Sequence, residues 1–90
     1  MSAFPVPLTL RGGEEGVLES WDGAFLRVRV PMPFAPGTPV RVLISLPTPL
    51  PFEGKSLGSK LEDDGLFTMR LRPVTLPKTT RVALDALRDA

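Results

Sequence analysis

The chain has 90 residues, enough for one domain with one modest core. Its 42% hydrophobic and 23% charged residues are typical of a folded globular chain, and a net charge of +1 selects neither sign of partner. Eleven prolines and eight glycines exclude a helical bundle. The lack of cysteine excludes disulfides and thiolate metal sites, and the lack of histidine and tyrosine removes two common acid–base groups.

We therefore expect a single domain over residues 1–90 that is not an enzyme and has neither cofactor nor metal site. The segment Met1 to Leu10 has no basic run and no continuous apolar stretch, so it is not expected to be a signal peptide. No segment approaches the roughly 20 apolar residues of a membrane helix. These features predict a cytoplasmic protein that does not associate with a membrane.

The N-terminal third predicts three strands joined by tight turns. Within Pro5 to Gly13, apolar residues alternate with other residues, which is typical of a half-buried strand. Gly12-Gly13 permits a turn into a short second strand over Glu15 to Ser20, and Asp22-Gly23 ends it. Ala24 to Val30 is the clearest strand. Its predicted core face is Ala24, Leu26, Val28 and Val30, and its outer face is Phe25, Arg27 and Arg29.

A loop and a fourth strand come next. The segment from Pro31 to Gly37 contains three prolines and cannot be a central strand, so we expect a loop whose Met32 and Phe34 lie against the barrel. Alternation over Val40 to Leu46 predicts a strand with Arg41 on its outer face.

Two more strands and a helix complete the prediction. Phe52 to Leu61 is a weakly patterned strand of uncertain register, interrupted by Gly54 and Gly58. The Asp64-Gly65 turn leads into a strand over Leu66 to Arg72. Pro77 to Asp89 has helical spacing. The predicted apolar stripe is Ala83, Ala86, Leu87 and Ala90, flanked by Val82 and Leu84.

These elements predict a mostly β fold, with six antiparallel strands and a short C-terminal helix. Sequential pairing closed into a small barrel would leave no exposed edges, and an open sandwich is the alternative.

The residues from Gly16 to Leu46 resemble the PilZ family. The similarity lies in Ser20-Trp21-Asp22-Gly23, the apolar and proline-rich loop, and the following Pro36-Gly37 with its valine-rich strand. The Phe52-Glu53-Gly54 and Asp64-Gly65-Leu66-Phe67 segments and the final helix extend this resemblance over most of the chain, in order. It implies a PilZ-like barrel.

The resemblance also implies a ligand, the bacterial messenger cyclic di-GMP, bound by an RxxxR motif and a D/N-x-S-x-x-G turn. Ser20 and Gly23 match the turn, but Leu18 replaces its acidic or amide residue. Arg11 is the one upstream arginine, and Glu15 stands four residues after it. A diphosphate ligand needs cations, so we expect this degenerate member to bind the messenger weakly or not at all.

The outward arginines Arg27, Arg29 and Arg41, with Arg70 and Arg72, form either a basic patch for an acidic partner or a solubilising face. Only Phe25 adds an aromatic ring, which argues against nucleic-acid binding. Acidic residues near both turns are expected to be solvated.

Trp21, Met32 and Phe34 are candidate contacts for a protein partner, although Trp21 could instead plug one end of the barrel. The leading hypothesis is a PilZ-like adaptor that binds a protein in bacterial motility, secretion or signalling. The alternatives are a cyclic di-GMP receptor using Arg11, Ser20 and Gly23, and a nucleic-acid-binding barrel using the arginine face.

Overall fold

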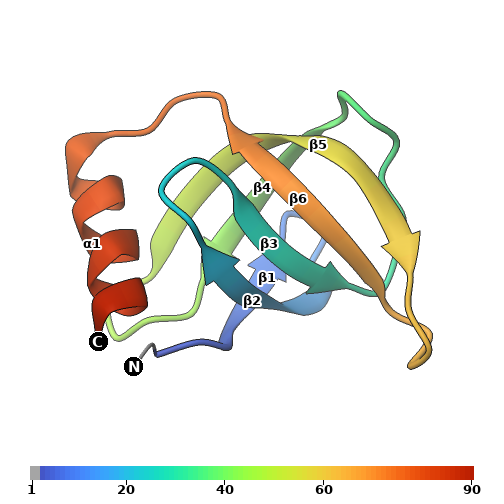
Figure 1. The fold of residues 1–90 in the computed structure, drawn as a ribbon, viewed down its shortest axis with the longest axis horizontal. Coiled ribbons are helices and arrows are strands. Elements are labelled where there is room, and N and C mark those ends of the chain that lie inside the picture. The colour runs from blue at the N-terminus through green and yellow to red at the C-terminus, as the bar shows by residue number, and fades with distance from the viewer. Residues whose placement is uncertain (1–2) are drawn as a thin grey trace.

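Strands build most of the structure, a computed structural model that describes residues 3–90 (Figure 1). Its elements are β1 (Val6–Leu10), β2 (Glu15–Trp21), β3 (Leu26–Val30), β4 (Pro39–Ile44), β5 (Leu50–Leu61), β6 (Phe67–Pro73) and α1 (Lys78–Asp89). The six strands form a closed antiparallel barrel, and α1 follows them. The predicted fold class is therefore confirmed. The first two residues, over which the expectation about a signal peptide extends, lie outside the described residues.

The order of strands around the barrel is β1-β2-β3-β6-β5-β4, and β4 pairs with β1 to close it. The expected sequential pairing is therefore wrong at two places: β3 pairs with β6 and not with β4, and the barrel is closed by β4 and not by β6. The cause is the proline-rich segment 31–38, which carries the chain around one end of the barrel before β4 begins (Figure 1). The alternation within each strand predicts the strand itself, but it does not predict which other strand pairs with it.

The core fills the inside of the barrel because alternate residues of each strand point inward. The fully or nearly fully buried apolar side chains are Val6, Leu8, Leu10, Leu18, Trp21, Leu26, Val28, Val30, Val40, Val42, Ile44, Phe52, Met69, Leu71 and Leu84. The predicted inner faces of β1, β3 and β4 are confirmed, apart from Ala24, which is exposed and precedes β3, and Leu46, which is half-buried and follows β4.

Helix α1 covers the end of the barrel opposite segment 31–38 (Figure 1). It buries Thr80 and Leu84 and packs Leu87 against the core, while Ala86 and Ala90 are exposed. The predicted stripe is therefore confirmed at Leu87 and wrong at Ala86 and Ala90. A leucine side chain buries far more apolar surface than an alanine, so Leu84 and Leu87 decide which face of the helix turns inward. Among residues 3–90, no helix has the length and hydrophobicity that crossing a bilayer requires.

A β-bulge in β5 shapes the end of the barrel that α1 leaves open. The pairing of β5 with β6 shifts register between Ser56 and Ser59, and Gly58 between them has φ +106°. This left-handed conformation is accessible to glycine and costly for other residues. Gly54 and Gly58 interrupt the alternating pattern of β5 in the sequence. Gly58 is the one at which the bulge bends the strand.

Candidate functional site

Segment 31–38 is fixed to the β5 bulge through the main chain of Phe34. The Ser59 hydroxyl accepts a hydrogen bond from the Phe34 N–H at 3.0 Å and donates to the Phe34 carbonyl oxygen at 3.1 Å. The Ser56 hydroxyl donates to the same carbonyl oxygen at 3.2 Å. The Gly37 N–H donates to the Ser56 carbonyl oxygen at 2.7 Å. These hydrogen bonds fix the main chain of the segment at Phe34 and Gly37.

Beside this segment lies a cavity of about 330 Å³, which we call the loop-end pocket. Its apolar lining is Leu10, Met32, Phe34, Pro39 and Val40, and its polar lining is Arg11, Gly12, Glu14, Arg41 and Glu53. The cavity is at the lower limit of small-ligand sites, so it suits one or two side chains of a partner. The structure thus brings together four residues that the sequence had suggested separately, namely Arg11, Met32, Phe34 and Arg41.

The two arginines of the loop-end pocket differ in their charge balance. Arg41 Nε lies 3.2 Å from Glu53 Oε2, so this cation is already paired. The Arg11 guanidinium, which is exposed, makes no ion pair within residues 3–90. Glu14 also lines the pocket. Arg11 is therefore the side chain at this rim that can receive a carboxylate from outside.

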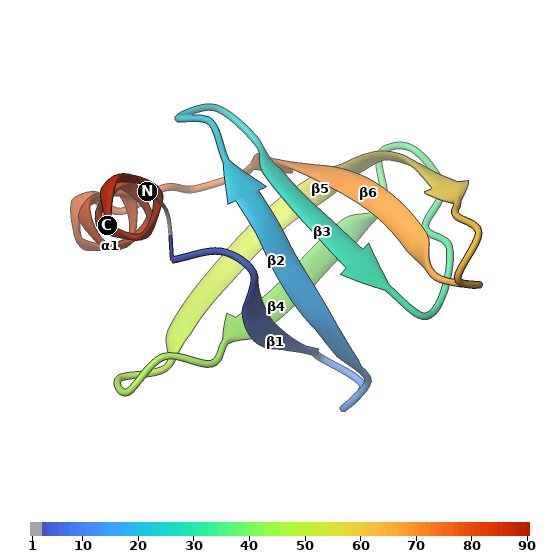
Figure 2. The same ribbon diagram turned by 60° about the horizontal axis from the view of Figure 1, so that its bottom comes forward.

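The structure does not bring Arg11 to Ser20 and Gly23. Arg11 lies in the β1–β2 turn, whereas Ser20 and Gly23 lie at the β2–β3 turn, and these turns are at opposite ends of β2 (Figure 2). The five residue steps of extended strand from Glu15 to Ser20 correspond to about 17 Å. The three residues therefore do not form one compact cluster.

The β2–β3 turn has its own structural explanation. Gly23 has φ +94°, which favours glycine whatever the function. Asp22 Oδ1 accepts hydrogen bonds from the Phe25 N–H at 2.7 Å and the Ala24 N–H at 2.8 Å. These two bonds, Phe25 first, hold the pKa of the Asp22 carboxyl below its usual value of 3.8. The resemblance in this segment therefore coincides with residues that build a turn.

Trp21 is buried between the barrel and α1. Only 1% of its surface is exposed, and its Nε1–H donates a hydrogen bond to Asp85 Oδ1 on α1 at 2.8 Å. Of the two interpretations of Trp21, the structure supports the one in which it plugs the barrel end. The interpretation of Trp21 as an exposed anchor was wrong. It relied on the charged residues near Trp21 in the sequence, but Asp22 is exposed to solvent whereas the neighbouring indole ring is buried.

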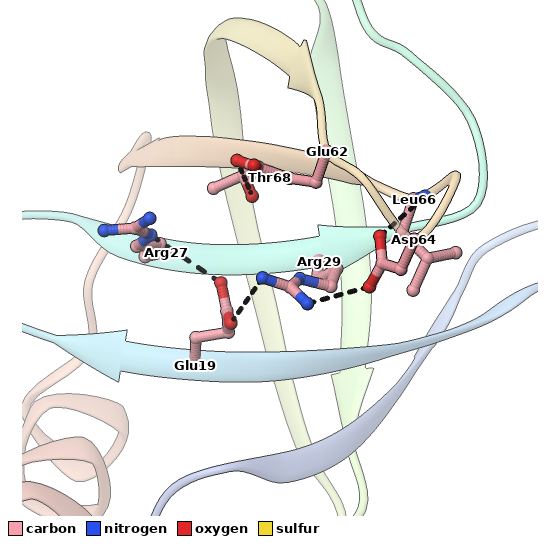
Figure 3. Close-up of polar contacts among 7 residues, drawn as sticks. All are labelled: Glu19, Arg27, Arg29, Glu62, Asp64, Leu66 and Thr68. Carbon is pink, nitrogen blue, oxygen red and sulfur yellow. Dashed lines mark hydrogen bonds and ion pairs between the residues drawn. The ribbon is translucent and has the colours of Figure 1, made fainter.

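The predicted arginine face is divided by the topology. Because β3 pairs with β6, Arg41 on β4 is separated from Arg27 and Arg29, contrary to expectation. Arg29 is neutralised by two carboxylates, Glu19 Oε2 at 3.4 Å and Asp64 Oδ2 at 2.8 Å (Figure 3). Arg27 Nε lies 3.6 Å from the other oxygen of Glu19, and its side chain is 55% exposed.

Three of the predicted arginines, Arg27, Arg70 and Arg72, do gather on the outer face of β3, β6 and β5, together with Lys55. The cross-strand register places Arg27 opposite Arg70 and Lys55 opposite Arg72. We call these four residues the basic band. Lys55 was missed as a site residue because the register of β5 and the β3–β6 pairing were not readable from the sequence. The sequence did contain an indication of its position, because Glu53, Lys55 and Leu57 alternate with buried residues and therefore share the outer side of β5.

The chain was compared with models of protein families, with curated proteins and with solved structures, and none of them matched. The class of protein that the fold defines is therefore a small closed six-stranded β-barrel with a C-terminal helix across one end. Within residues 3–90, no three carboxylates lie close enough together to hold a metal ion.

Proposed function

We propose that this chain is a non-catalytic, PilZ-like adaptor module that binds a protein partner in the loop-end pocket. An apolar side chain of the partner enters between Met32, Phe34 and Val40, and a carboxylate beside it pairs with Arg11. The resemblance to the PilZ family suggests the setting, which is bacterial motility, secretion or signalling. The loop-end pocket is proposed as the binding site on the basis of its geometry and not of this resemblance.

The observation that carries the proposal is the convergence of three separate segments on one pocket. The β1–β2 turn provides Arg11, segment 31–38 provides Met32 and Phe34, and the β4–β5 pair provides Val40 and Glu53. The serine hydroxyls that hold Phe34 fix the apolar side before any ligand arrives. A preformed site loses less conformational entropy on binding than one that must be ordered.

Two alternatives receive less support. A cyclic di-GMP receptor would need Arg11 beside Ser20 and Gly23, and these residues lie at opposite ends of β2. A nucleic-acid-binding barrel would need an arginine face with free aromatic rings, whereas Arg29 and Arg41 are already paired with carboxylates. An enzymatic role receives less support because the chain has no histidine, cysteine or tyrosine to act as an acid, a base or a nucleophile.

Site-specific photo-crosslinking in the cells that produce the protein tests the proposal. A photoreactive residue is placed at position 32 in the pocket and, as a matched control, at position 82, which is 57% exposed on α1. We expect a discrete crosslinked protein from position 32 that is absent from position 82. Introducing Arg11→Glu should abolish that product. Equal products from both positions, or none from position 32, would contradict the proposal.

A further inference from the structure

The basic band places like charges in direct opposition on neighbouring strands. Arg27 faces Arg70 across the β3–β6 pair, and Lys55 faces Arg72 across the β5–β6 pair. Side chains directly opposite each other have Cβ atoms about 4.5–5.5 Å apart, and like charges in such pairs destabilise a sheet. All four side chains are exposed and point outward. Their buried strand neighbours are Val28, Ser56, Met69 and Leu71.

Carboxylates of the chain do not neutralise this band. Within residues 3–90, Arg70, Arg72 and Lys55 make no ion pair, and Arg27 makes a single contact of 3.6 Å with Glu19. Of the nearby carboxylates, Glu53 pairs with Arg41. Asp22 accepts two main-chain hydrogen bonds and interacts with Arg70 through charge alone, without an ion-pair contact. Three of the four cations in the basic band therefore have no ion-pair partner within residues 3–90.

The band also contains apolar surface. Leu57 belongs to the β5 bulge opposite Arg70 and is 39% exposed. Phe25 lies beside β3, and the Arg70 guanidinium carbon stands 5.2 Å from the centre of its ring. A partner on this face therefore meets four cations around two apolar side chains.

These features favour an acidic protein segment over a nucleic acid. Single strands bind through free aromatic faces on which bases stack, and the one ring here is already covered by Arg70. Nucleic-acid-binding domains usually have a strongly basic pI, above about 9, whereas this chain has a pI of about 8.3. Because the barrel is closed, a partner cannot add a strand to it and must be recognised by side chains.

We propose that the basic band is a second docking surface, separate from the loop-end pocket, for a partner-protein segment rich in carboxylates with interspersed apolar residues. The carboxylates pair with Lys55, Arg70 and Arg72, and the apolar residues contact Leu57. Binding relieves the repulsion between the opposed cations, so the like-charge pairs that destabilise the free protein contribute to affinity in the complex.

Fluorescence anisotropy with a labelled peptide rich in glutamate and aspartate, with interspersed leucines, tests this surface directly. We expect the double variant Arg70→Gln/Arg72→Gln to bind the peptide about tenfold more weakly than the wild type. The matched variant Lys78→Gln/Arg81→Gln removes the same charge from α1 and should change affinity less than about twofold. Arg11→Glu should likewise have little effect, so failure here is distinguishable from failure at the loop-end pocket.

Single-stranded oligothymidylate of the same length is titrated in parallel. Tighter binding of the oligonucleotide than of the peptide, lost in the Arg70→Gln/Arg72→Gln variant, would overturn the assignment to an acidic protein and assign the band to nucleic acid. Absence of peptide binding to the wild type, or equal weakening by both double variants, would overturn the docking surface itself.

Discussion

Asp85 connects the helix to the barrel by a single side-chain contact. Its Oδ1 atom accepts the Trp21 Nε1–H bond at 2.8 Å and also lies 3.4 Å from Arg88. Removing the acceptor leaves a largely buried indole N–H without its partner. We expect Asp85→Ala to lower the free energy of unfolding by about 1–2 kcal/mol.

Asp85→Asn is the matched control, because its amide oxygen still accepts the bond while the charge is lost. Urea denaturation should show that this variant loses less than half as much stability as Asp85→Ala. Equal losses would show that the ion pair with Arg88, and not the indole bond, holds α1.

Asp22 provides a pH-dependent contribution to stability. Main-chain hydrogen bonds from Phe25 and Ala24 lower the pKa of its carboxyl in the folded state below the 3.8 of the free group. The ionised form is therefore favoured by folding, and this contribution is fully present well above pH 3.8. It declines as the pH falls through 3.8 and is lost below the folded-state pKa.

We expect Asp22→Asn to flatten this part of the stability profile, because the amide oxygen accepts the same bonds without titrating. Unfolding free energies measured from neutral to acid pH check this. An unchanged acid slope in the variant would show that other carboxylates cause it.

At the scale of the helix, side-chain volume and not residue count decides the buried face. Leu84 is 0% exposed, whereas Val82 is 57% exposed two positions earlier. We expect Leu84→Ala to lower the free energy of unfolding by about 2–4 kcal/mol and Val82→Ala by less than about 0.5 kcal/mol. Similar losses in the two variants, measured by urea denaturation, would mean that α1 packs on the face that the alanine spacing suggested.

The outer surface of β5 and β6 offers a test of the like-charge pairs. Arg72→Glu converts the opposition of Lys55 and Arg72 into an attraction, so we expect the free energy of unfolding to rise by about 0.5 kcal/mol. The gain should shrink at high salt, which screens exposed charges. The same variant should lose affinity for the acidic peptide. A gain in stability together with a loss of affinity is expected where residues that bind a partner destabilise the free protein. A variant that is less stable than the wild type would show that the two cations do not repel each other.

Period-two alternation made most strands predictable, because an apolar residue at every second position can be recognised directly in the sequence. Three features of the fold could not be predicted in this way. The partner of β3 depends on where the chain goes after segment 31–38. The face of α1 depends on how Leu84 and Leu87 pack against the core. The acceptor for the Trp21 indole is Asp85, 64 positions away. Long-range contacts of this kind decided which candidate residues became neighbours.

The same reasoning applies to the candidate sites. Met32 and Phe34 could be expected to lie against the barrel because a proline-rich segment with large apolar residues must cover something. That Arg11 and Arg41 lie beside them required the β1–β4 pairing, which closes the barrel and brings the main chains together, with the Arg11 N–H donating to the Arg41 carbonyl oxygen at 3.2 Å. Lys55 joined the basic band only through the pairing of β5 with β6.

At the scale of the whole molecule, the two turns of β2 face different ends of the barrel, and this arrangement predicts the response to cyclic di-GMP. A compact diphosphate ligand cannot reach Arg11 and the Ser20 to Gly23 turn together, because about 17 Å of strand separates them. Titration of isotope-labelled protein should therefore leave the amide signals of both turns in place or move them independently, with no common saturation. Arg11→Ala should not change the response of Ser20 and Gly23. Shifts at both turns that saturate together, and that Arg11→Ala abolishes, would contradict this and would assign the messenger a binding mode that bridges the barrel.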